Sequence, residues 1–230
     1  DRVYRDALKR APDAVPLLLA YASLLRAQGR ASQAERRLRK ALKIAPDSVA
    51  AWHALGLLLY AGGTYAEAER CARRMTELAP ANAAAWELLA AISQKRGALE
   101  QAIAACREGL AHVPDAPRLL YSLAQLLRED TDFASSAEAY LQAQRAGFDS
   151  PDLYRNRGEA LLESGDPQGA LACAREGTQR YPGHALLQRN AARLHYEVAA
   201  PGDPLDELHT AARAVKTDPA LWQTLVELQR

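Results

Sequence analysis

Residues 49–82 read VAAWHALGLLLYAGGTYAEAERCARRMTELAPAN, and this stretch decides the fold. In its first half, Trp52 and Leu55 recur at helical spacing, and Gly63 stands where a helix would end. The second half keeps a helical spacing through Ala68 until Pro80, which disfavours helix in the residue before it. The stretch therefore predicts two short antiparallel helices, whose close approach is allowed by small residues such as Gly56 and Ala68.

The same pattern recurs along the chain with a period of 34 residues. Prolines close successive units at one position, at Pro12, Pro46, Pro80, Pro114 and, two periods later, Pro182. Glycines occupy a second position, at Gly29, Gly63, Gly97 and Gly165, with Thr131 at the missing place. Small residues occupy a third, at Ala34, Ala68, Ala102, Ser136 and Ala170. A fixed period of this size indicates a repeat array, in which each unit packs on its neighbours.

The motif W-x2-L-G-x2-[Y/L], followed by an alanine and then a proline, resembles the tetratricopeptide repeat (TPR), a helix–turn–helix unit. The composition agrees with helices, because good helix formers are abundant and no stretch is rich in Val, Ile and Thr. The resemblance implies an all-α fold, namely a right-handed α-solenoid of stacked antiparallel helix pairs, the TPR superhelix.

We expect a single TPR array over residues 1–230. Residues 1–14 are expected to be the second helix of a leading partial repeat, and residues 220–230 a terminal or capping helix. The full repeats are expected at 15–48, 49–82, 83–116, 117–150 and 151–184, with an irregular one at 185–219. The register slips at Phe148, which replaces the closing proline, and at Pro219, which comes three residues late. Both ends cut into a repeat, which predicts a longer natural protein.

The charge balance does not favour nucleic-acid binding, and the apolar runs do not favour a membrane span. The chain carries 29 Lys and Arg against 28 Asp and Glu, a formal net charge of +1. Residues 1–80 hold 14 basic and 8 acidic side chains, and the remainder reverses the sign without reaching an extreme. The longest apolar run, residues 17–25, is too short to cross a bilayer.

A basic run lies on the predicted second helices, which in TPR proteins form the outer, convex layer. It consists of Arg36, Arg37, Arg39, Lys40, Lys43, Arg70, Arg73 and Arg74. One reading is an ordinary solvated face. The other is a docking patch for an acidic protein, nucleic acid or membrane.

The sequence holds none of the common catalytic or metal motifs, such as H-E-x-x-H, a Walker-type glycine loop, G-x-G-x-x-G or G-x-S-x-G. The segment from Asp130 to Asp132 lies between two predicted helices, where Asp commonly caps. His195 and His209 can approach each other across a hairpin, but a metal site needs more ligands. We expect the chain of residues 1–230 to have no enzymatic activity, cofactor or metal.

The three cysteines, Cys71, Cys106 and Cys173, cannot all pair, and no C-x-x-C occurs. This usage favours a reducing compartment and hence the cytoplasm, with the periplasm left open. Each cysteine falls in the middle of a predicted second helix among alanines. We therefore expect small buried packing residues, since a redox thiol needs an exposed, electropositive setting.

The TPR resemblance also implies a concave groove lined by the first helices. In the first three full repeats the inward positions are mostly small or apolar, at Leu19, Ala20, Ser23, His53, Ala54, Leu57, Tyr60, Glu87, Leu88 and Ala91. In the next three they are polar and form the candidate partner-binding site, at Arg118, Tyr121, Gln125, Arg128, Arg155, Asn156, Glu159, Arg189, Asn190 and Arg193. Arg can hold a carboxylate bidentately, and Asn can bond a peptide backbone in both directions. An ordinary wet polar face is the alternative.

Together these features predict a non-catalytic scaffold that binds a protein or an extended peptide in its groove. The alternative is the substrate-recruiting arm of a larger enzyme, such as a glycosyltransferase, sulfotransferase or oxygenase, attached as a covalent neighbour. A homo-oligomer formed through the terminal helices is a further prediction, because Trp222 and Leu225 would be exposed if no seventh repeat follows.

Overall fold

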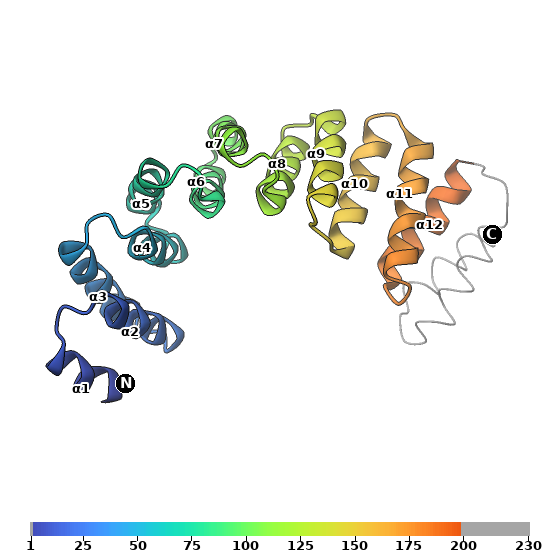
Figure 1. The fold of residues 1–230 in the computed structure, drawn as a ribbon. Helices are drawn as coiled ribbons and strands as arrows, with labels where there is room; N and C mark the ends of the chain where they lie inside the picture. Colours follow the sequence, from blue (N-terminus) through green and yellow to red (C-terminus); the bar gives the residue numbers. More distant parts are fainter. Residues whose placement is uncertain (1, 199–230) are drawn as a thin grey trace. The chain divides into compact units, whose positions relative to one another are not determined.

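The computed structural model describes residues 2–198, which form helices and no strand (Figure 1). The helices are α1 (Arg2–Arg10), α2 (Val15–Ala27), α3 (Ala31–Ile44), α4 (Val49–Ala61), α5 (Tyr65–Leu78), α6 (Ala83–Lys95), α7 (Leu99–His112), α8 (Pro117–Glu129), α9 (Phe133–Arg145), α10 (Pro151–Glu163), α11 (Pro167–Arg180) and α12 (Ala185–Glu197). The expected all-α class of successive helix pairs is confirmed. The expectations for the end of the irregular repeat, His209, Pro219 and the terminal helix lie outside the described residues.

The chain divides into two compact units, residues 1–119 and residues 120–230. In the first unit α2 packs on α3, α4 on α5 and α6 on α7, and in the second α10 packs on α9 and α11, and α11 on α12. We call α2, α4, α6, α8, α10 and α12 the first helices and α3, α5, α7, α9 and α11 the second helices. First helices also contact one another, α2 with α4, α4 with α6 and α10 with α12. Each unit therefore has a continuous first-helix face.

The turn between the two helices of a pair requires one residue in the left-handed region. Gly29, Gly63, Gly97 and Gly165 have φ of 73°, 75°, 73° and 85°. Thr131, at the missing place in the glycine series, adopts the same conformation with φ of 61°. Its backbone N–H donates to Arg128 O at 3.1 Å, as Gly29 donates to Arg26 O at 2.9 Å. The turn is thus kept without glycine, at a strain cost of about 1–3 kcal/mol for a β-branched residue.

Side-chain caps fix several helix starts. Asp132 accepts a hydrogen bond from the Ser135 N–H at 3.2 Å and begins α9, which confirms the capping role expected for this acidic turn. Ser48 begins α4 in the same way, by accepting from the Ala51 N–H at 3.3 Å. Each cap satisfies one of the N–H groups that the first helical turn leaves unpaired.

The small-residue series lies where the two helices of a pair approach most closely. Ala34, Ala68, Ala102, Ser136 and Ala170 are all 0% exposed. Ser136 is the one polar member, and its hydroxyl donates to Ala124 O at 2.8 Å, so its burial leaves no polar group unpaired. Across the interface, a Cβ at Gly56 would lie 3.3 Å from the Cys71 Cβ. Larger side chains at these positions would force the helices apart.

A hydrogen bond to the closing proline links successive repeats. The indole N–H of Trp52 donates to Pro46 O at 2.7 Å, and that of Trp86 donates to Pro80 O at 2.8 Å. At the same position of the irregular repeat that begins at residue 185, the Gln188 amide donates to Pro182 O. Each of these proline carbonyls lies in the turn just beyond the second helix and outside its hydrogen-bond ladder, so a side chain of the next first helix supplies the donor. Gln188 thus occupies the position of the tryptophan and supplies the same kind of N–H donor.

Gly109 of α7 tests the close-packing argument. A Cβ there would lie 2.5 Å from the Trp86 Cγ and 2.6 Å from its Cβ, closer than real contacts allow. We expect Gly109→Ala to lower the free energy of unfolding by about 1–3 kcal/mol, measured by urea denaturation. Gly158→Ala is the matched control, because its nearest neighbour would be Ala170 O at 3.8 Å. That change should stabilise by about 0.5–1 kcal/mol through helix propensity, and equal losses in both variants would contradict the account.

Candidate functional site

The residues selected from the sequence lie on three first helices. Helix α8 carries Arg118, Tyr121, Gln125 and Arg128, α10 carries Arg155, Asn156 and Glu159, and α12 carries Arg189, Asn190 and Arg193. Arg118 belongs to the first unit and the other nine belong to the second. Gln125 and Arg193 are exposed, Asn156 is buried, and the remaining residues of the second unit are half-buried.

Four of these residues meet between α10 and α12. Arg155 and Glu159 of α10, with Asn190 and Arg193 of α12, line one recess. The rest of its wall is mostly apolar, with Tyr154, Gly158, Leu162, Ala174, Leu187 and Leu194. The enclosed space is about 10 Å³, roughly that needed by a single water. A bound segment would therefore lie across the recess and meet its polar rim.

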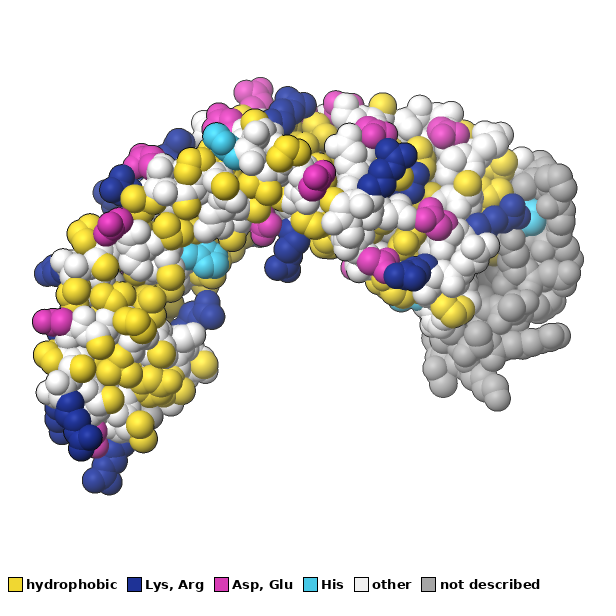
Figure 2. Space-filling model, in the orientation of Figure 1, with side chains coloured by type: hydrophobic (Ala, Val, Ile, Leu, Met, Phe, Trp, Pro, Cys, Tyr) yellow, Lys and Arg dark blue, Asp and Glu magenta, His cyan; other side chains and the backbone are white. Residues whose placement is uncertain are grey.

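A chain of ion pairs joins α8 and α10 within the second unit. Glu159 accepts from Arg128 at 2.7 Å and from Arg155 at 3.4 Å, and Arg155 also reaches Asp152 at 3.0 Å. On the face shown in Figure 2, Lys and Arg side chains likewise alternate with Asp and Glu over the helices of this unit. Ion pairs that remain this accessible to water contribute little net stability, so a partner's carboxylate can replace one at low cost.

Asn156 is only 2% exposed, and its amide donates to the Tyr121 hydroxyl at 3.1 Å. Its Oδ1 and the hydroxyl of Tyr140 are buried without a hydrogen-bond partner among the described residues. Tyr140 is fully buried and contacts Tyr121 edge-on at 5.5 Å between ring centroids. Asn156 thus lies beneath the first-helix face and holds the side chain that forms part of it.

Tyr121 is also held from its other side by Phe148, the residue that replaces a closing proline. The two rings stack with centroids 4.3 Å apart and an interplanar angle of 19°. Burial raises the pKa of Tyr121, so its hydroxyl stays protonated at neutral pH. The loss of the proline therefore has a local consequence, since an aromatic ring at this position fixes a candidate site residue.

The first-helix face of the first unit has a different character. Helices α2, α3 and α4 enclose a hollow of about 380 Å³ lined mostly by apolar groups. Five of the expected groove residues line it, Leu19, Ser23, His53, Ala54 and Leu57. Burial, aided by the positive charge of Arg26, lowers the pKa of His53, so its imidazole is neutral at physiological pH. Figure 2 shows a broad hydrophobic area over the N-terminal helices of this unit.

Glu87 and Arg118 lie together in the first unit. Burial raises the pKa of Glu87, and the positive charge of Arg118 opposes that shift. Arg118 is exposed and takes no part in the α10–α12 recess.

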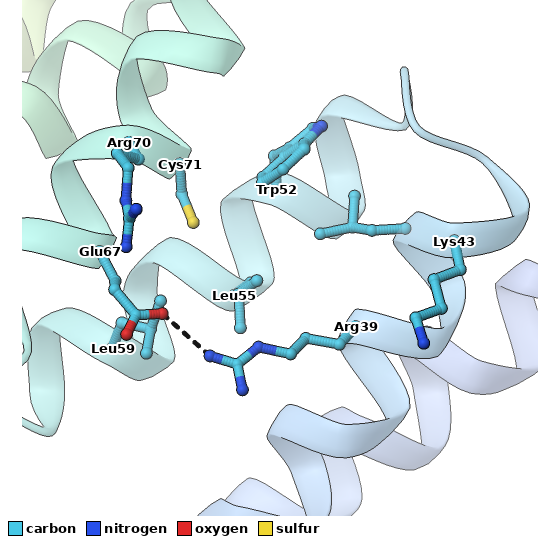
Figure 3. Close-up of a pocket in the computed structure, with 9 residues that line it drawn as sticks. Arg39, Lys43, Trp52, Leu55, Leu59, Glu67, Arg70 and Cys71 are labelled. Atoms are coloured by element: carbon cyan, nitrogen blue, oxygen red, sulfur yellow. Dashed lines mark hydrogen bonds and ion pairs between the residues drawn. The ribbon is translucent and has the colours of Figure 1, made fainter.

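A third hollow lies on the side of the second helices and was not foreseen from the sequence. It holds about 460 Å³ between α3, α4 and α5, and basic residues of the run noted above stand at its rim (Figure 3). The only sequence signal was that basic run, which by itself does not distinguish a pocket from a solvated face.

The cysteines are free and buried. Burial raises the pKa of Cys71 and Cys173 to about 11 and that of Cys106 to about 12. These thiols therefore pack as small apolar groups, as the sequence predicted. Among the described residues no three His, Cys, Asp or Glu side chains gather as a metal site, and none of the helices is long and apolar enough to cross a membrane.

Two models of the tetratricopeptide repeat match most of the chain. One matches residues 2–55 and 25–92, and the other matches residues 94–152, 121–185 and 155–219. The chain belongs to the tetratricopeptide repeat family. Membership supports a protein-interaction scaffold, the usual role of TPR arrays. No curated protein sequence matches the chain.

Solved TPR structures share the fold at low sequence identity. PilF of Pseudomonas aeruginosa has a TM-score of 0.66 and 19% identity, over 84% of this chain and 86% of that one. A TPR protein of Parabacteroides merdae has a TM-score of 0.65 and 15% identity, over 94% and 86% of the two chains. The APC/C hetero-tetramer Cut9–Hcn1 gives a TM-score of 0.63 and 16% identity, with 98% of this TPR chain spanning only 44% of its counterpart. At these identities the likeness shows the fold alone.

Two hydroxyl groups in the Asn156 cluster have opposite expected effects. Tyr121→Phe removes the acceptor for the buried Asn156 amide and should lower the free energy of unfolding by about 1–3 kcal/mol. Tyr140→Phe removes a hydroxyl that has no partner among the described residues and should be neutral or stabilising. Urea unfolding of the two variants checks this, and a loss confined to Tyr140→Phe would contradict the assigned bonding.

The thiol pKa values predict slow chemistry in the folded protein. With pKa values of about 11 or 12, almost no thiolate exists at about pH 8, and burial excludes the reagent. We expect Ellman's reagent to titrate the cysteines slowly in native buffer and completely after denaturation. Rapid native labelling of Cys106, which is 0% exposed, would contradict the packing role.

Proposed function

We propose that this TPR protein is a non-catalytic scaffold that binds an extended segment of a partner protein along the first-helix face of its second unit. The observation that carries the proposal is the recess between α10 and α12. Arg155, Glu159, Asn190 and Arg193, selected by repeat register alone, come from two successive repeats and line the same recess.

The chemistry of that rim suits a peptide with acidic side chains. Arg155 is held by Asp152 and Glu159 on its own helix, in pairs whose carboxylates are half-buried or exposed. A carboxylate of the partner can take over one such pair with two parallel hydrogen bonds. Asn190 offers both a donor and an acceptor to a passing backbone. Leu162, which is half-buried, adds apolar surface beside this rim for a flanking apolar side chain.

Tyr121 and Asn156 have a supporting role in this proposal. Asn156 is too buried to meet a ligand directly. It fixes Tyr121 through one hydrogen bond, and Phe148 fixes the same ring by stacking. A side chain held from two directions loses little entropy on binding, which favours affinity.

The apolar hollow between α2, α3 and α4 of the first unit supports a second point of attachment. Its volume of about 380 Å³ falls in the range of ordinary ligand pockets, and its lining is largely Leu and Ala. We propose that it takes an apolar side chain of a partner, with His53 neutral at its rim.

We keep the recruiting arm of a larger enzyme as an alternative proposal. The Cut9–Hcn1 comparison bears on chain length alone, because this chain spans only 44% of that counterpart. The intact mass of the native protein decides this point. A mass matching the 230 residues would remove the alternative.

The groove proposal is tested by selecting a displayed library of short random peptides on the protein. Selected peptides are then measured by fluorescence anisotropy against a variant combining Arg155→Ala, Asn190→Ala and Arg193→Ala. We expect affinity to fall roughly tenfold or more, since two charge-assisted contacts and one amide contact are lost.

The matched control combines Arg145→Ala, Gln179→Ala and Arg180→Ala. It removes the same charge and one amide from exposed positions on α9 and α11. Unchanged binding by the control, with unchanged circular dichroism for both variants, supports the groove. Equal affinity of the groove variant and the wild type would contradict the proposal.

A further inference from the structure

The hollow on the second-helix side of the first unit has an apolar floor and a basic rim. Trp52, Leu55 and Leu59 of α4 form the floor, while Leu42 of α3 and Cys71 of α5 form apolar walls. Figure 3 shows α4 lying between the two second helices, with Lys43 on one side of the opening and Arg70 on the other. Its volume of about 460 Å³ is that of an ordinary ligand pocket.

A single residue difference at one repeat position accounts for the pocket. In the next repeat Trp86 is only 7% exposed, because Gly109 of α7 lets the indole pack directly against that helix. One period earlier the place of Gly109 is taken by Met75, a large side chain that is itself fully buried. Trp52 cannot settle equally close to α5, so it stays half-exposed and lines the open hollow.

The charges around the opening are only partly neutralised within the protein. Arg39 is paired with Glu35 at 2.7 Å and with Glu67 at 2.9 Å. Lys43 and Arg70 have no carboxylate partner among the described residues, and Lys43 is exposed. The pocket therefore presents two available cations on opposite sides of an apolar floor, with one carboxylate, Glu67, already occupied.

We propose that this pocket docks an acidic segment of a partner protein, which inserts one large apolar side chain and places carboxylates on both sides of it. The apolar floor stabilises the inserted side chain by removing it from water. The separation of Lys43 and Arg70 by α4 fits carboxylates that flank that side chain along a chain. This is a further interaction surface, on the second-helix side of the first unit and made of other residues than the proposed groove.

The same features argue against two other polyanions. Non-specific nucleic-acid binding relies on several phosphate contacts along a basic track, whereas four of the eight residues of this run are already paired internally. Besides Arg39, these pairs are Lys40 with Asp13, Arg73 with Glu69 and Arg74 with Glu77. A lipid surface requires a broad apolar face with a basic border, while this apolar area is a confined pocket. Both remain outcomes of the test.

The test uses the full chain and a fluorescently labelled pentapeptide with a central phenylalanine and glutamate at the other positions. Binding is followed by anisotropy at low salt, where exposed charges are least screened. We expect a variant with Lys43→Ala and Arg70→Ala to bind roughly tenfold more weakly, as two exposed ion pairs are lost. A peptide with glycine in place of phenylalanine should also bind more weakly to the wild type.

The matched control carries Arg36→Ala and Arg107→Ala, which remove the same charge from exposed second-helix positions that do not line the pocket. It should bind the phenylalanine peptide like the wild type. Failure of the peptide to bind, equal losses in the two variants, or no preference for phenylalanine would each overturn the proposal. So would binding to phosphatidylserine vesicles or a single-stranded oligonucleotide that exceeds peptide binding and ignores the Lys43→Ala, Arg70→Ala change.

Discussion

The close approach of the two helices in each pair is the constraint on which the rest of the structure depends. The small-residue series supplies it, because side chains at these positions are fully buried at the helix contact. Close packing at one contact fixes where the other faces of each helix point. The first-helix face and the second-helix side of a unit are therefore set by residues that belong to neither surface. Ser136 shows that size matters more than polarity here, since its hydroxyl is satisfied by Ala124 O.

Variation at the contacts, on an otherwise constant scaffold, gives the molecule its distinct surfaces. Gly109 draws Trp86 inward, while Met75 at the corresponding position leaves Trp52 beside an open pocket. Phe148, in place of a closing proline, stacks on Tyr121 and stiffens part of the candidate groove. In a repeat array each repeat contacts only its neighbouring repeats, so such changes act locally and leave the fold intact.

The period of the sequence was sufficient to predict the all-α class and the helix–turn–helix unit, because prolines, glycines and small residues mark helix ends and contacts directly. It also selected four residues that line one recess between α10 and α12. It could not predict that Asn156 is buried, because burial depends on Tyr121 and Tyr140, which lie in other helices. Nor could it predict the pocket beside Trp52, since that pocket depends on the volume of the Met75 side chain, which belongs to a different helix.

The central claim is that partner segments lie on the first-helix face of the second unit. The most direct measurement is amide chemical-shift mapping by NMR of the labelled protein, with and without the tightest selected peptide. The account predicts that the largest changes cluster at Arg155, Glu159, Asn190 and Arg193, on two helices that share one recess. Changes confined to the second helices α9 and α11, with α10 and α12 unaffected, would contradict it.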